Sequence, residues 1–253
     1  MFKPEEDLIQ IIEFEITRPE KPIAFIGLPD VGLVGVIAVS HMIENMGMKE
    51  IGYVDSEIFP PVIVFHNGNP KHPIRIYQKD CYLAVMTEIA LPALTYPPLT
   101  KALTKWLYDK RVEMVFSLSG VGVPNRLDIE KPQVYGASTS PSVRDFLKSH
   151  NIPLFEEGFL VGPYALIAKY SQSLGLQNAL LLAQAFPQYP DPGAAAAVID
   201  VINRIYGLNI DTKALEERSE EIRIKARELM RRTYDTMRQM GKSQEYELPL
   251  MYA

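Results

Sequence analysis

Short blocks of hydrophobic and polar residues define the first fifty positions of the chain. Residues 8–16 alternate partly between apolar and polar side chains, which predicts an edge strand. Residues 22–26 form a short apolar run typical of a buried strand, and a glycine-bearing turn follows at residues 27–30. The apolar stretch after this turn predicts a helix to about Met46 that ends at Gly47. Together these segments predict a strand–turn–helix unit.

The next part of the chain contains short apolar runs separated by clusters of Pro, Gly and Asn. Such clusters favour tight turns, and the runs between them have the length of strands. The spacing therefore suits hairpins or a meander. The runs lie at residues 51–54, 62–65, 74–77 and 81–88.

The second half alternates between helical and strand-like periods. Ser140 precedes a proline and can accept an N–H at the start of its helix, and Asp191 opens another helix that Gly207 closes. Repeated alternation of strands and helices indicates an α/β fold, a mixed, mostly parallel sheet flanked by helices. The predicted helices lie at residues 98–109, 141–148, 164–174 and 193–206, and the strands at 112–118 and 179–185, with a glycine loop at 119–122 and a strand or turn at 159–162.

The last forty residues differ from the rest. Asp211 and Thr212 can cap a helix that runs to about residue 240, with an apolar seam at seven-residue spacing. Such a seam fits a helix that packs on its own domain or on a neighbouring subunit, and both arrangements stay open. Residues 241–253 lack a period and contain a proline, so we expect a flexible tail. The expected organisation is a core domain (1–210), a C-terminal helix (211–240) and the tail (241–253).

Composition narrows the class of protein. The chain has 253 residues and a formal net charge of -5, with basic and acidic residues intermixed. A nucleic-acid partner is not expected, because a phosphate-binding face is normally basic. No apolar run is long enough to span a membrane, the first residues are acidic where a signal peptide is basic, and Cys81 has no cysteine partner. We therefore expect a cytoplasmic, soluble protein with no membrane partner.

Two glycine segments are candidate ligand sites, but neither has the companions of a known chemistry. Pro29 stands where a dinucleotide-binding loop needs its second glycine, and no lysine follows as in a P-loop. Ser119 opens the second segment, at the end of a predicted strand, without a nucleophile elbow. The histidines show no metal-ligand spacing. We expect no catalytic residues, no cofactor and no metal site.

The C-terminus is the strongest candidate for a binding site. The polar tail ends in hydrophobic side chains, at Met251, Tyr252 and Ala253. Exposure of such side chains to water is unfavourable, so we expect a partner to bury them. A partner could bury Met251 and Tyr252 and bind the terminal carboxylate through a lysine. Two alternatives stay open at this point, in which the tip folds back onto its own domain or has no role.

Several segments resemble archaeal members of the proteasome-assembly-chaperone family. Met251-Tyr252-Ala253 matches the hydrophobic–tyrosine–any-residue signature (HbYX) by which proteasome activators and assembly factors insert between α-ring subunits. The other matching segments are IAFIGLPDVGLVG at residues 23–35, GFLVG at 158–162, ALLLA at 179–183 and PDPGAAA at 190–196. The resemblance covers about residues 8–225.

The resemblance implies a nucleoside-phosphorylase-like α/β fold without the phosphorylase active site. It also implies binding to α-subunits of the proteasome core particle, with Met251 as the hydrophobic position, Tyr252 filling a pocket and the Ala253 carboxylate meeting a lysine. Archaeal relatives are similar in forming homo-oligomers, of which a ring is one form. A second protein partner, a scaffold role for another protein, and an enzyme acting on nucleosides are the alternatives to weigh.

Overall fold

The computed structural model describes residues 8–14 and 19–242. Its strands are β1 (Gln10–Glu13), β2 (Ile23–Gly27), β3 (Lys49–Asp55), β4 (Val64–His66), β5 (Asn69–Lys71), β6 (Ile74–Lys79), β7 (Tyr82–Thr87), β8 (Met114–Gly122), β9 (Val134–Ala137) and β10 (Asn178–Ala185). Its α-helices are α1 (Val34–Met46), α2 (Tyr96–Asp109), α3 (Pro141–Ser149), α4 (Pro163–Leu174), α5 (Pro192–Tyr206), α6 (Lys213–Glu217) and α7 (Ser219–Gln239). Short 3-10 turns are η2 (Val31–Leu33), η3 (Ala93–Thr95) and η4 (Arg126–Asp128).

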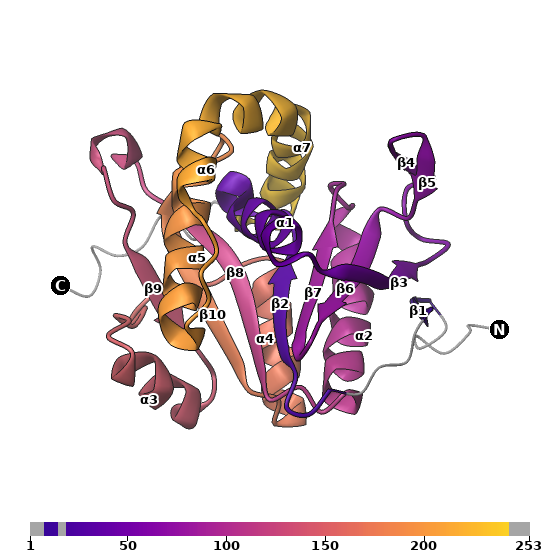
Figure 1. Ribbon diagram of the computed structural model, residues 1–253, viewed down its shortest axis with the longest axis horizontal. Helices are drawn as coiled ribbons and strands as arrows, with labels where there is room; N and C mark the ends of the chain where they lie inside the picture. Colours follow the sequence, from indigo (N-terminus) through magenta and orange to yellow (C-terminus); the bar gives the residue numbers. More distant parts are fainter. Residues whose placement is uncertain (1–7, 15–18, 243–253) are drawn as a thin grey trace.

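One 8-stranded sheet runs through the domain in the order β1-β3-β6-β7-β2-β8-β10-β9. Its four central strands, β7, β2, β8 and β10, pair in parallel, whereas the pairings on both flanks are antiparallel. The predicted meander is confirmed by the antiparallel pairing of β3, β6 and β7. The α/β class and the mixed sheet are therefore confirmed, with the parallel part in the centre (Figure 1).

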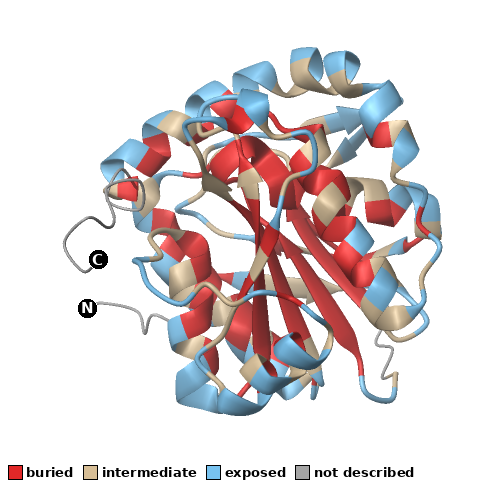
Figure 2. Cartoon of the chain, turned by 90° about the vertical axis from the view of Figure 1, so that its left-hand side faces the viewer, coloured by how far each residue is buried: buried red, intermediate tan, exposed pale blue. Residues whose placement is uncertain are grey.

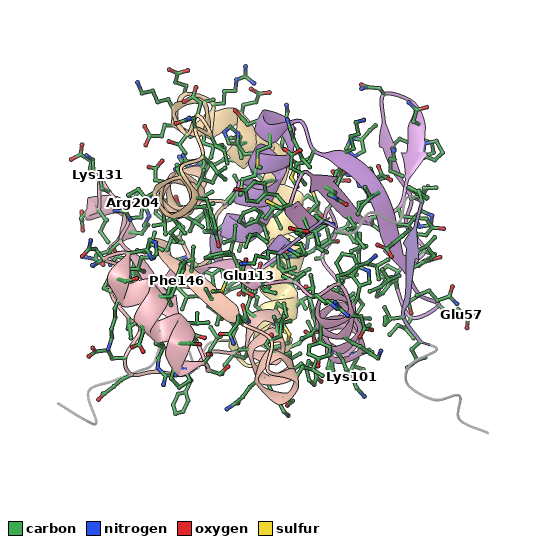
Figure 3. The ribbon with its side chains drawn as sticks, turned by 60° about the horizontal axis from the view of Figure 1, so that its bottom comes forward. Glu57, Lys101, Glu113, Lys131, Phe146 and Arg204 are labelled. Carbon is green, nitrogen blue, oxygen red and sulfur yellow. The ribbon has the colours of Figure 1, made fainter. Side chains whose placement is uncertain are left out.

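Helices cover both faces of the sheet because successive residues of the central strands point to opposite sides. Phe25 packs in the hydrophobic layer with α1 and α5, and its neighbour Ile26 packs in the opposite layer with α2 and α4. Figure 2 shows the central strands buried along their length, while the helices bury only their inward faces. Viewed from the amino ends of the parallel strands, Phe146 of α3 and Lys101 of α2 lie on opposite sides of Glu113 (Figure 3).

Two glycines let α1 approach the sheet closely. A Cβ atom on Gly27 would lie 2.6 Å from the carbonyl oxygen of Gly35, and one on Gly35 would overlap the carbonyl oxygen of Leu118. Neither position tolerates a side chain without backbone movement. The glycines of the first candidate segment thus serve close helix–strand packing.

Three expectations about local structure are wrong. Residues 119–122 do not form a loop, because they continue β8 and pair with residues 182–185 of β10. The side chain of Ser140 does not cap α3 and instead bonds Gln177. The single helix expected at 211–240 is interrupted at Arg218, which separates α6 from α7.

The seam of the C-terminal helix faces its own domain. Of the seam residues Leu215, Ile222 and Leu229, the first is buried and the other two are partly buried, and all three pack in the hydrophobic layer of α1 and α5. Met230 and Met237 of α7 are buried in the same layer. Met240, just after α7, packs in the opposite layer. The end of α7 therefore crosses from one layer to the other at the edge of the sheet. Packing on the body, one of the two arrangements left open by the sequence, is therefore present in the single chain.

Candidate functional site at the carboxyl edge of the sheet

The two glycine segments singled out in the sequence meet at the carboxyl ends of β2 and β8. Asp30 follows β2 and Ser119 lies within β8, and the hydroxyl of Ser119 donates a hydrogen bond of 2.8 Å to Oδ2 of Asp30. Both side chains are buried, at 1% exposure. This edge is where open α/β sheets bind their ligands. The structure thus brings the two candidate segments together at this edge, and the side chains found there determine what chemistry it can perform.

A lysine from the other end of the chain fills this site. The ammonium group of Lys242 lies 2.9 Å from Oδ2 of Asp30 and donates a 2.5 Å hydrogen bond to the carbonyl oxygen of Val161. The Lys242 side chain is 2% exposed, so the cation is almost fully removed from water. The other oxygen of the Asp30 carboxylate, Oδ1, is buried without a hydrogen-bond partner among the described residues.

Tyrosines complete the wall behind Asp30. The Tyr164 hydroxyl accepts a 2.8 Å hydrogen bond from the amide of Leu28 and donates one of 3.0 Å to the carbonyl oxygen of the same residue. Burial, and then the negative charge of Asp30, raise the pKa of Tyr164 well above its ordinary value. The same two causes raise the pKa of Tyr96. Both phenols therefore stay neutral and serve as hydrogen-bonding walls rather than as acids or bases near neutral pH.

The turn after β2 is held in an unusual conformation. Leu33 is fully buried and has a φ of 51°, in the left-handed region that a branched side chain rarely adopts. Two hydrogen bonds hold the turn in place, from the amide of Leu33 to the carbonyl of Asp30 and from the amide of Asp191 to the carbonyl of Gly32. The packing around the turn thus fixes Asp30 beside β8.

A second buried ion pair lies on the same side of the sheet. Arg126 donates from Nε to Oδ2 of Asp191 at 2.8 Å and from Nη2 to Oδ1 at 3.1 Å. Asp191 also accepts from the amide of Ala194, which confirms its predicted role at the start of α5, and from that of Phe186. This carboxylate joins the loop after β8 to the loop after β10.

The four histidines of the chain make their contacts elsewhere. His41 bonds the carbonyl of Asp211, His66 pairs with Glu88, His72 stacks on Tyr53 and His150 bonds the carbonyl of Phe146. Within residues 8–14 and 19–242, the structure contains no group of His, Cys, Asp and Glu side chains placed to hold a metal ion. In the same ranges, no helix is both long and apolar enough to cross a membrane.

A sequence model of the PAC2 family matches residues 24–230 of the chain. The chain belongs to the PAC2 family. The resemblance to proteasome-assembly chaperones noted in the sequence is thereby confirmed at the level of the family.

Solved structures agree with this assignment. The PAC2 chain superimposes on Pyrococcus furiosus PbaA, described as an archaeal homolog of proteasome-assembly chaperone, with a TM-score of 0.82 and 29% identity over 91% of this chain and 98% of that one. Pyrococcus furiosus PbaB, described as an archaeal proteasome activator, shares the fold at a TM-score of 0.73 and 23% identity, covering 87% and 98% of the two chains. The Methanocaldococcus jannaschii protein MJ0106 is 24% identical over 96% of this chain and 98% of its own.

A groove of about 640 Å³ lies on the surface of this PAC2 protein. It lies between α1 on one side and α6 and α7 on the other, and His66 of the β4–β5 hairpin reaches its rim. The hairpin projects from the body (Figure 1). On the hairpin and the segment before it, Ile63 and Phe65 are 56% and 63% exposed. Neighbouring apolar side chains that are exposed together are typical of a protein-binding surface.

The predicted docking residues Met251, Tyr252 and Ala253 lie outside the described residues, as does the rest of the tail after Lys242. The covalent start of that tail is nevertheless fixed, because Lys242 is buried at the carboxyl edge of the sheet. Sequence reasoning found Asp30 and Ser119 as parts of glycine segments but missed Lys242. A lysine in a polar segment normally stays in water, so no local signal marks it as buried.

Proposed function

We propose that this protein docks on the α-ring of the proteasome core particle through Met251, Tyr252 and Ala253 and serves as a non-enzymatic assembly chaperone or activator. In this proposal the protein works in the cytoplasm as a homo-oligomer that presents several copies of the C-terminal tail. A three-residue anchor binds weakly alone, and several copies facing one ring raise the effective concentration of each.

The observation that carries the proposal is the similarity to PbaA along nearly the whole chain, combined with the Met-Tyr-Ala ending. Burial of the Met251 and Tyr252 side chains in a pocket contributes roughly 2 kcal/mol each. A fully extended segment from 243 to 253 spans at most about 40 Å, so the tip can reach a partner that lies against the carboxyl edge of the sheet.

The contents of the carboxyl edge support a non-enzymatic role. The place where a phosphorylase-like fold would admit a substrate is filled by the side chain of Lys242, which pairs with Asp30. The neighbouring hydroxyls of Tyr164 and Ser119 bond Leu28 and Asp30. The described side chains that contact Asp30 are thus a serine and a lysine, and the lysine comes from the chain itself.

The test is co-sedimentation of the purified full-length protein with proteasome core particles, with negative-stain imaging of the complexes. A truncation that lacks residues 251–253 and the variant Tyr252→Ala are expected to lose binding. Tyr246→Ala, a tyrosine substitution in the same tail but outside the final three residues, is the matched control and is expected to bind normally. Full-length protein that fails to sediment with core particles, or truncated protein that still does, would refute tail docking.

The groove between α1 and α7 favours one alternative function, an oligomeric scaffold for another protein. In that case the exposed Ile63 and Phe65 contribute to partner binding while residues 251–253 do not. The double variant Ile63→Ser, Phe65→Ser is expected to leave sedimentation with core particles unchanged under the proposed function. The scaffold alternative instead predicts that the full-length protein does not sediment with core particles at all. Loss of that sedimentation in the double variant, with retention in the truncation, would place core-particle binding on the hairpin rather than on the tail.

A further inference from the structure

The ion pair between Asp30 and Lys242 has the properties of a bound ligand. Its partners are 212 positions apart in sequence, and their side chains are 1% and 2% exposed. The pair lies at the edge of the sheet where α/β proteins bind small molecules. Burial of two charges is costly, and an apolar pair of the same volume is often as stable, so simple packing does not explain why a cation stands here.

The surroundings of the ammonium group form a cradle built for a cation. Asp30 supplies the negative charge through Oδ2, and the carbonyl oxygen of Val161 accepts a second proton of the same ammonium group. Ser119 orients the carboxylate by donating to the same oxygen. The opposite oxygen of Asp30, Oδ1, is buried and has no hydrogen-bond partner among the described residues, so the carboxylate depends on the cation for most of its compensation.

Shape also selects the ligand. Met240 and the backbone of Gly162 line the stem of Lys242, and Gly162 has a φ of 101°, which favours glycine. A carboxylate and a carbonyl oxygen that each accept a hydrogen bond from one ammonium group fit a linear primary ammonium group. A guanidinium is planar and presents its donors as a wide fork, which suits this geometry less well.

We propose that the carboxyl edge of the sheet is a binding site for a primary alkylammonium group, that Lys242 is its resident ligand, and that this occupancy fastens the end of α7 to the sheet. The site would thus hold a segment of its own chain where related α/β folds hold substrates. This inference stands on the Asp30 site alone and does not depend on whether residues 251–253 bind the proteasome.

The helix that Lys242 fastens is attached to the body along one face only. Met230, Thr233, Thr236 and Met237 are its buried side chains, and the hydroxyl of Thr233 has no hydrogen-bond partner among the described residues. The opposite face carries exposed ion pairs such as Lys225 with Glu221. Loss of the Lys242 contact should therefore loosen α7 before the rest of the domain.

Chemical rescue tests the proposal on the full-length protein. Lys242→Ala removes the stem and the ammonium group, and n-propylammonium has the same atoms as the deleted part. We expect Lys242→Ala to lower the melting temperature by about 10 °C. Added n-propylammonium chloride should restore much of this loss, in a concentration-dependent way. Sodium chloride and tetramethylammonium chloride at equal concentration should not, and Lys225→Ala is the matched control on the exposed face of α7.

Two further variants keep the test decisive. In Asp30→Asn, Lys242→Ala the rescue should disappear, because the carboxylate that binds the ammonium is gone. Lys242→Met keeps an apolar stem and should raise amide hydrogen exchange in the last turns of α7 by about 100-fold, a readout that also serves if Lys242→Ala does not fold. Rescue by tetramethylammonium as strong as by n-propylammonium, rescue that survives Asp30→Asn, or unchanged exchange of α7 in Lys242→Met would overturn the proposal.

Discussion

Replacement of Asp191 tests how much the loops at the carboxyl edge depend on one carboxylate. Asp191 is fully buried and accepts hydrogen bonds from Arg126 at 2.8 and 3.1 Å, from the amide of Phe186 at 3.1 Å and from that of Ala194 at 3.0 Å. Asp191→Ala removes all of these acceptors. It also leaves the guanidinium of Arg126, whose side chain is 8% exposed, without its counter-charge.

The expected cost follows from these contacts. Removal of one partner from a buried ion pair costs about 3–5 kcal/mol, and loss of a helix cap costs about 1 kcal/mol. Some of this is offset because Arg126 still donates to the carbonyl oxygen of Ile129. We expect Asp191→Ala to lower the free energy of unfolding by about 4 kcal/mol, which corresponds to a fall in melting temperature of about 12 °C.

Urea unfolding monitored by circular dichroism measures this cost, and a double-mutant cycle with Arg126→Met assigns it. The double variant should be less destabilised than the sum of the single ones, because no charge is then left buried alone. Asp128→Asn, at an exposed position in the same 3-10 turn as Arg126, is the control and should change stability little. A loss below about 1 kcal/mol for Asp191→Ala, or strictly additive effects, would refute the reasoning.

Two further predictions concern the packing of α1 and the charges of α7. Gly35→Ala should lower the free energy of unfolding by at least about 2 kcal/mol, because the added Cβ would overlap the carbonyl oxygen of Leu118. Ser40→Ala, on the same helix, is the control and should cost less. Equal melting temperatures of the two variants would contradict this reasoning. Hydrogen bonds from Arg231 and Arg232 lower the pKa of Glu228 from 4.5 to about 2, so the stabilisation that Glu228 gives α7 is present above pH 4.5 and is lost as the pH falls towards 2. A titration of the Glu228 carboxyl carbon by NMR checks the value, and Arg231→Gln should raise it.

The central strands and most helices could be predicted from the sequence because their signals are local. The apolar run of β2, the left-handed Gly47 after α1 and the Asp191 cap of α5 each depend on neighbours within a few residues. The single helix expected at 211–240 was wrong only at Arg218, where the chain breaks between α6 and α7. No glycine or proline lies at that position, so the periodic pattern of apolar residues predicts one continuous helix.

Features that depend on distant partners could not be predicted. Residues 119–122 look like a glycine loop, yet β10 pairs with them and makes them strand; Gly120 has no room for a Cβ because Ala185 and the carbonyl oxygen of Val31 are close. The local sequence of the short edge strand β9 does not predict a strand, which is recognised only by its pairing with β10. Burial of Lys242 is the extreme case, since its reason is an aspartate at the other end of the chain.

The large separation of Asp30 and Lys242 in sequence determines when their contact can form during folding. Asp30 is in place only when β2 lies beside β8, and the wall at Val161 and Tyr164 requires α4. Contacts between such distant residues form late in folding, after the loops between them have closed. A nascent chain therefore gains its Lys242 contact after the central sheet has assembled. The base of the tail is therefore anchored at Lys242 only in a chain whose domain has already folded. In a partially folded chain this anchor is absent.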